Sequence, residues 1–124
     1  MEFFGHVIDG AEVKSASGET FASVDPYTRE PWAEVALGGA GEVDRAVTAA
    51  RRAFDEGPWP RLSRAERGRL LHRLADLIVA DTDRLALADT RDMGKPIAQS
   101  RGKDVPRAAD NFRFFRRPRP PDTS

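Results

Sequence analysis

The chain has 124 residues, 40% of them hydrophobic and 32% charged, which fits one soluble globular domain or part of one. Twenty Lys and Arg balance twenty Asp and Glu, so the chain lacks the surplus of positive charge with which a nucleic-acid binder neutralises phosphates. The sequence has no cysteine, no apolar run long enough to cross a membrane and no signal peptide at its start, so we expect a cytoplasmic protein without disulfides, thiolate chemistry or a membrane partner.

The first third of the chain predicts a small antiparallel β element. Residues 6–9 and 11–14 flank Asp9 and Gly10, a dipeptide suited to a type I′ turn, in which both central residues need a positive φ. These residues therefore predict a short hairpin. Thr20–Asp25 alternates apolar and polar residues as a strand does, and Trp32–Ala36 predicts another strand.

The spacing of apolar residues then changes to a helical period. Residues 43, 46, 47, 50 and 54 share one side of a helix that the Gly57-Pro58 pair ends. Ser63 and Glu66 have the spacing of a capping box, in which each side chain accepts a hydrogen bond from the other's backbone N–H. Apolar residues at 70, 71, 74, 77 and 78 follow, so we predict a helix over residues 64–80.

Two further helices are predicted before residue 116. One runs over residues 83–93, with Gly94 as its C-cap and Pro96 just beyond. The other has Pro106 near its first turn and carries Ala109, Phe112 and Phe115 inward.

The final nine residues differ from the rest of the chain. Residues 116–124 hold three prolines and no other apolar residue, so they predict an extended, disordered tail after a folded part at residues 1–115. The Arg116–Arg119 segment is either an accidental tail or a proline-rich ligand for an SH3-like groove.

Several segments, in this order, resemble the start of the aldehyde dehydrogenase superfamily. Residues 7–59 resemble the family's opening hairpin, its turn after a strand, and a helix here reading "VDRAVTAARRAF". Residues 63–97 resemble the next two helices with a signature that reads "DMGKP" here, and residues 104–115 resemble the helix that follows. The chain is thus identified as an N-terminal fragment of this family. It departs at the turn, where Asp25 and Arg29 replace the family's Asn and Gly.

The resemblance implies a fold and a chemistry. The fold class is α/β: a β-hairpin and strands followed by about four helices, part of the family's dinucleotide-binding domain, with the parallel sheet itself largely missing. The family oxidises an aldehyde with NAD or NADP, using a cysteine thiolate, a carboxylate base and an amide that holds the oxyanion. The resemblance places all of these beyond the matched stretch. We therefore expect no catalytic residue and no bound NAD or NADP in this chain alone.

The resemblance also implies one metal site. Some family members hold a structural monovalent cation with main-chain oxygens before the turn and with the Asp of the signature, which match Ser23, Val24 and Asp92 here. Carbonyl and carboxylate oxygens suit hard cations. The alternative is that Asp92 merely helps to end the helix beside Gly94, which we favour.

Other candidate side chains have structural explanations that we favour. His6 and His72 are the only histidines, and His72 is expected at a helix surface rather than on a metal. Asp81 or Asp83 is expected to favour a helix N-terminus, while Asp89 and Asp92 are expected to face solvent. Trp32 and Trp59 are predicted to be packing residues.

Three functions remain open from the sequence. The leading one is a non-catalytic fragment of an aldehyde dehydrogenase, whose helical faces lack the sheet they would cover, so that the chain is loosely packed and prone to associate. The second is an interaction module that docks with a separate remainder or with full-length relatives, including as a homo-oligomer. The third is a small-molecule binder.

Overall fold

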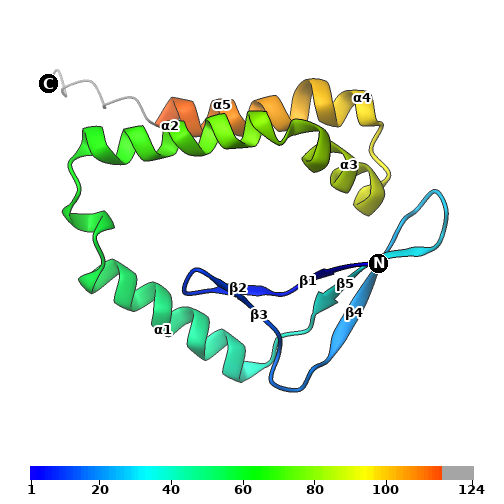
Figure 1. Cartoon of the computed structure of the whole chain (residues 1–124), viewed down its shortest axis with the longest axis horizontal. Coiled ribbons are helices and arrows are strands. Elements are labelled where there is room, and N and C mark those ends of the chain that lie inside the picture. Colours follow the sequence, from blue (N-terminus) through cyan, green and yellow to red (C-terminus); the bar gives the residue numbers. More distant parts are fainter. Residues whose placement is uncertain (116–124) are drawn as a thin grey trace, which may run out of the picture. The chain divides into compact units, whose positions relative to one another are not determined.

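The structure is a computed structural model that describes residues 1–115 (Figure 1). It divides into two compact units. Unit 1 comprises residues 1–60 together with 91–94, and unit 2 comprises residues 61–90 and the described residues from 95 onwards.

Unit 1 contains a three-stranded sheet in the order β1-β5-β4. β4 (Thr20–Val24) and β5 (Pro31–Ala36) pair in antiparallel fashion at the predicted positions. β1 (Glu2–Phe4) pairs with β5 in parallel, and the sequence did not predict it. The antiparallel prediction was therefore wrong for this edge, because a three-residue strand is too short to show alternation and its partner is distant in the sequence.

The predicted hairpin is confirmed as a separate two-stranded sheet. β2 (His6–Ile8) and β3 (Ala11–Val13) pair in antiparallel fashion, with His6 opposite Val13. Asp9 and Gly10 between them have φ angles of 54° and 77°. Both φ angles are positive, as the type I′ turn predicted from the Asp-Gly pair requires.

The turn between β4 and β5 accommodates both departures from the family pattern. Asp25 Oδ1 accepts hydrogen bonds from the backbone N–H groups of Tyr27, at 2.8 Å, and Thr28, at 3.3 Å. An aspartate thus forms the local turn that an asparagine would form. Arg29 has a φ of 63°, in the left-handed region where a glycine is least strained.

α1 (Ala40–Glu56) follows β5 after a connection of three residues, 37–39, and ends at the predicted Gly57. A 3₁₀ turn, Trp59–Arg61, follows.

Unit 2 begins with the predicted capping box. The N–H of Ser63 donates to Glu66 Oε2 at 2.7 Å, and the N–H of Glu66 donates to Ser63 Oγ at 3.1 Å, so α2 (Arg64–Ala80) begins where expected. α3 (Thr82–Met93) ends at Gly94, whose φ of 76° confirms the predicted C-cap.

The last helical segment begins earlier than predicted. α4 (Ile97–Gln99) continues through a π-helical turn, Ser100–Asp104, into α5 (Val105–Phe115). Pro106 is the second residue of α5, in its first turn as predicted, although helical backbone already precedes it from Ile97 onwards. Proline has no N–H to donate, and the preceding turn has the wider π pattern, in which the N–H of Val105 donates to the Ser100 carbonyl.

The buried core consists of small side chains. Its apolar members are Ala33, Ala36, Ala75, Ala86, Val105 and Ala109. In unit 2, α2 and α5 lie side by side (Figure 1). The predicted inward position of Ala109 is confirmed, since it is fully buried, and Phe112 is half-buried. The predicted inward side chain of Phe115 and the predicted tail at 116–124 lie outside what the structure describes.

Candidate functional site

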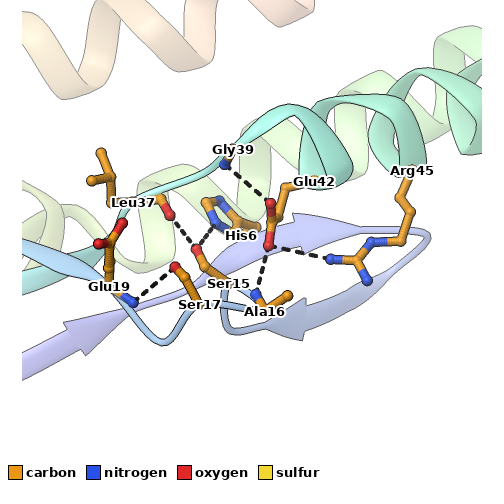
Figure 2. A network of polar contacts seen from close by, with 9 residues as sticks. All are labelled: His6, Ser15, Ala16, Ser17, Glu19, Leu37, Gly39, Glu42 and Arg45. Atoms are coloured by element: carbon orange, nitrogen blue, oxygen red, sulfur yellow. Dashed lines mark hydrogen bonds and ion pairs between the residues drawn. The ribbon is translucent and has the colours of Figure 1, made fainter.

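A network of polar contacts lies at the start of α1 (Figure 2). Glu42 is buried there, and its Oε1 accepts a hydrogen bond from the N–H of Ala16 at 2.6 Å. Its Oε2 accepts from the N–H of Gly39 at 3.0 Å, and Arg45 lies 3.4 Å from Oε1. A single carboxylate thus joins the loop after β3 to the first turn of α1.

These donors strongly stabilise the ionised form of Glu42. The N–H of Ala16 is the largest cause, followed by that of Gly39, and together with smaller contributions they lower the pKa of Glu42 from 4.5 to about 2. Sequence reasoning missed this residue. The signal was present, because Glu42 stands three residues after the N-cap Gly39, the spacing at which a Glu reaches back to the N-cap N–H.

His6 and Ser15 form the second half of this cluster. His6 Nε2 lies 2.8 Å from Ser15 Oγ, and Ser15 is buried. The Ser15 hydroxyl donates to the carbonyl of Leu37, so His6 Nε2 carries the hydrogen in the contact between the two side chains. A histidine in that form does not act as a base towards Ser15, and a hydroxyl held on a carbonyl is not an activated nucleophile. The pair is a structural link between β2 and the end of β5.

The connection from β5 to α1 has the strand, glycine-rich turn and helix order of a nucleotide-binding turn, but it lacks the complete glycine spacing. A strand leads through Gly38, Gly39 and Gly41 into a helix, but Asp44 stands where a third spaced glycine would complete the fingerprint. Nucleotide phosphates bind such turns through free N–H groups at the helix start. Here the carboxylate of Glu42 already accepts from Gly39 and lies at that end of the helix. The residues present therefore do not fit a dinucleotide.

The structure brings together two of the three residues assigned to a cation. The Ser23 hydroxyl donates to Asp92 Oδ1, and Trp32 Nε1 donates to Ser23 Oγ at 3.3 Å. Val24 is the next residue of β4. The Asp92 carboxylate thus has a protein donor, and the contact fixes the end of α3 beside β4 within unit 1. The cation at Ser23, Val24 and Asp92 stays a prediction.

Two of the aspartates form ion pairs on the surface of unit 2. Asp81, between α2 and α3, accepts hydrogen bonds from the Arg84 guanidinium, which lowers the pKa of its carboxyl. Asp83 lies in the first turn of α3, as predicted, and pairs with Arg101 at 2.9 Å.

Asp89 does not simply face solvent, and that prediction was wrong. It is half-buried, and its Oδ2 accepts from the hydroxyl of the fully buried Ser100 at 2.5 Å. Lys95 and Asp104 form an ion pair at 2.6 Å nearby in the sequence. Polar contacts therefore fix both sides of the π turn, a tertiary effect that local sequence does not reveal.

The remaining candidates are structural. His72 Nε2 lies 3.6 Å from Asp76 one turn along α2. The Trp32 ring meets Phe4 edge-on at 5.9 Å between centroids, which agrees with a packing role, while Trp59 is only about half-buried in its 3₁₀ turn. Among residues 1–115 no three His, Asp or Glu side chains are grouped so that they could hold a metal. No helix in that range is long and apolar enough to cross a membrane.

A shallow pocket of about 230 Å³ lies in unit 1. Its lining residues come from β1, the loop after β3, and the sheet: Phe3, Lys14, Ser15, Gly18, Glu19, Thr20, Glu34 and Ala36. It is smaller than the roughly 300–1,000 Å³ of typical ligand sites. Its charged lining residues are of both signs, since Lys14 carries an ammonium group and Glu19 and Glu34 carry carboxylates. The Lys14 ammonium already lies 5.5 Å from the centroid of the Phe3 ring. This pocket does not favour the small-molecule hypothesis.

Comparison with known proteins gives consistent matches. The sequence model of the aldehyde dehydrogenase family matches residues 13–118. The chain is 50% identical over 109 residues to "Aldehyde dehydrogenase family 2 member B4, mitochondrial" of Arabidopsis thaliana, covering 88% of this chain and 20% of that protein. It is 45% identical over 115 residues to a 2-hydroxymuconic semialdehyde dehydrogenase of Pseudomonas, and the match covers 93% of this chain and 24% of that protein. The NAD+ complex of a Bacillus cereus aldehyde dehydrogenase superposes with a TM-score of 0.89 at 35% identity, over 93% of this chain and 23% of that one. The chain thus spans about a fifth of the length of its relatives.

Proposed function

Because this chain belongs to the aldehyde dehydrogenase family, which it matches as an N-terminal fragment, we propose that it is a non-catalytic scaffold segment of an NAD(P)-dependent enzyme. That enzyme would oxidise an aldehyde to a carboxylate. The observation that carries this proposal is the family match together with the absence of cysteine from all 124 residues, since the family's nucleophile is a cysteine thiolate.

The overall reaction converts an aldehyde, water and NAD(P)+ into a carboxylic acid and NAD(P)H with release of a proton. None of the polar clusters described within residues 1–115 supplies a step of this reaction. The Ser15 hydroxyl donates to a carbonyl, and Glu42, with a pKa of about 2, is too weak a base to take a proton near neutral pH. The role that remains for these side chains is to hold the β-hairpin against the start of α1.

The second candidate, an interaction module, is favoured by the large apolar side chains that α1 and α2 expose. The two proposals agree on a segment that works within a larger assembly. They differ in whether that assembly turns over an aldehyde. The cytoplasmic location also stays a proposal, and the Arabidopsis relative is named as mitochondrial.

The test is to purify the 124-residue chain and measure reduced nicotinamide formation by absorbance with NAD+ or NADP+ and a panel of aldehydes. We expect no rate above the buffer control and no saturable binding of either nucleotide by calorimetry. Turnover by the isolated chain would contradict the proposal. A second arm supplies the missing part: the region of the Arabidopsis relative that follows the match is co-expressed with this chain, and reduced nicotinamide formation by the pair is expected.

A further inference from the structure

The two units of the chain carry opposite net charges. Residues 1–60 and 91–94, which form unit 1, hold six Lys and Arg against twelve Asp and Glu. The described residues of unit 2, 61–90 and 95–115, hold eleven Lys and Arg against seven Asp and Glu. The balanced charge of the whole chain thus conceals a net charge of −6 on one unit and +4 on the other. Surfaces of opposite charge attract each other and associate faster than neutral ones.

The positive charge of unit 2 is concentrated in one segment. Residues 61–73, which span the end of the 3₁₀ turn and the first half of α2, contain five arginines and one glutamate, and we call them the arginine segment. Arg61, Arg64 and Arg73 are exposed, and within residues 1–115 they have no carboxylate partner. Like charges this close along a helix repel one another. The segment is therefore suited to an acidic surface supplied by a partner.

Unit 1 contains a site of matching chemistry. Glu19 and Glu34 line the shallow pocket of this unit together with the ring of Phe3. Phe3 on β1 is paired with Glu34 on β5, so the two side chains are neighbours on one face of the sheet. Within residues 1–115 neither carboxylate forms an ion pair. The pocket thus offers two unpaired carboxylates beside an aromatic ring.

These groups are the ones that recognise a guanidinium. Its planar fork pairs with carboxylates and stacks on aromatic rings, which an ammonium does less well. The pocket already accepts a cation, since the Lys14 ammonium lies 5.5 Å from the Phe3 ring centroid. Its volume of about 230 Å³ is small for a metabolite and suits one long side chain. Because two carboxylates outnumber one ammonium, the pocket keeps a negative charge for an incoming arginine.

We propose that the pocket of unit 1 receives an arginine from the arginine segment of a second copy of the chain. A second copy is the occupant that the charges favour, because each copy carries both the acidic pocket and the unpaired arginines. Two copies related by a twofold axis form this contact twice, which closes the pair and leaves neither surface unused. The association does not rest on the proposed function.

Sedimentation velocity of the 124-residue chain measures this association. A dimer is expected whose dissociation constant rises about tenfold between about 50 mM and about 300 mM salt, because screening weakens exposed charge pairs. Glu34→Lys reverses a charge in the pocket, and Arg64→Glu/Arg73→Glu reverses the segment; each is expected to weaken dimerisation about tenfold. Lys14→Met removes the competing cation and is expected to strengthen dimerisation about threefold. Glu19→Lys gives the same pocket reversal from the loop before β4 and replaces Glu34→Lys if β5 does not tolerate that change.

Mixing the two charge-reversed variants separates this contact from a general effect of net charge. In a mixed dimer the reversed pocket of one copy meets the reversed segment of the other, while the remaining pocket and segment keep their original charges. Both contacts are attractive again, so the mixture is expected to dimerise within about threefold of the unsubstituted chain.

Matched controls change the net charge equally at exposed positions outside the pocket and the segment. Glu56→Lys on α1 matches the pocket variant, and Lys103→Glu/Arg107→Glu matches the segment variant. Each is expected to dimerise within about threefold of the unsubstituted chain. Circular dichroism checks that every variant is folded.

Five results would overturn the proposal. The chain stays monomeric at low salt, its dimer is indifferent to salt, the controls weaken the dimer as much as the pocket and segment variants do, or the mixture does not restore it. The fifth concerns nuclear magnetic resonance signals of the pocket residues, which are expected to shift on dilution. Signals that respond to salt and to segment reversal but not to dilution would mean that the arginine comes from the same chain.

Discussion

The contact between α2 and α5 should tolerate no larger side chain at Ala109. This residue is fully buried on α5, and Ala75 is fully buried on α2, so both helices have only a methyl group at these positions. Ala109→Leu adds three carbons where no space exists. Overpacking of this kind costs about 1–3 kcal/mol. In a domain of this size each kcal/mol lowers the melting temperature by about 4–8 °C.

The neighbouring residue supplies the control. Ala108 is exposed on the same helix, so Ala108→Leu makes the same chemical change and leaves the interface alone, with an expected effect within about 0.5 kcal/mol. Urea and thermal unfolding, followed by circular dichroism, measure both variants. Hydrogen exchange of the α2 and α5 amides shows whether the loss is local. Equal midpoints for the two variants would refute the small-residue packing of these helices.

Three further changes test the local structure. Ser63→Ala removes one half of the capping box of α2 and should cost about 1 kcal/mol in urea unfolding. Gly94→Ala should cost about 1–2 kcal/mol, because the residue has a φ of 76° and a new Cβ would lie 3.2 Å from Pro26 Cγ; Gly41→Ala, which meets no neighbouring atom, should not destabilise the chain. The lowered pKa of Glu42 stabilises the folded state above pH 4.5, and this contribution should fall away as the pH drops from 4.5 towards about 2. Glu42→Gln should therefore be less stable at neutral pH, and its free energy of unfolding should decrease less on acidification. An unchanged dependence of stability on pH would show that the carboxylate is not held as described.

The elements that the sequence predicted well are those with local causes. The Asp9-Gly10 turn, the Ser63–Glu66 capping box and the Gly94 C-cap each depend on residues a few positions apart. Their physical origin lies in backbone conformation and in hydrogen bonds within one turn. A single sequence is enough to recognise such features.

What the sequence did not predict depends on distant partners. β1 exists because it pairs in parallel with β5, about thirty positions later. The early start of the last helical segment accompanies the buried contact of Ser100 with Asp89. Glu42 was recognisable as an N3 residue, but its contact with Ala16 joins two elements and needed the structure. The predicted closeness of Ser23 and Asp92, 69 positions apart, came from the resemblance and not from local pattern.

Two kinds of observation support the proposed scaffold role: the polar cluster at the start of α1 and the exposed apolar side chains of α1 and α2. At the start of α1, where backbone N–H groups of a helix can bind an anion, the chain's own Glu42 accepts hydrogen bonds from the N–H groups of Gly39 and Ala16. That arrangement stabilises the fold and removes a ligand site. Along α1 and α2, large apolar side chains such as Phe54 and Leu77 are exposed to solvent rather than buried in the core of their own unit. The polar groups described here hold the chain's own elements together while large apolar side chains of α1 and α2 stay exposed, and both observations support the scaffold role that we propose.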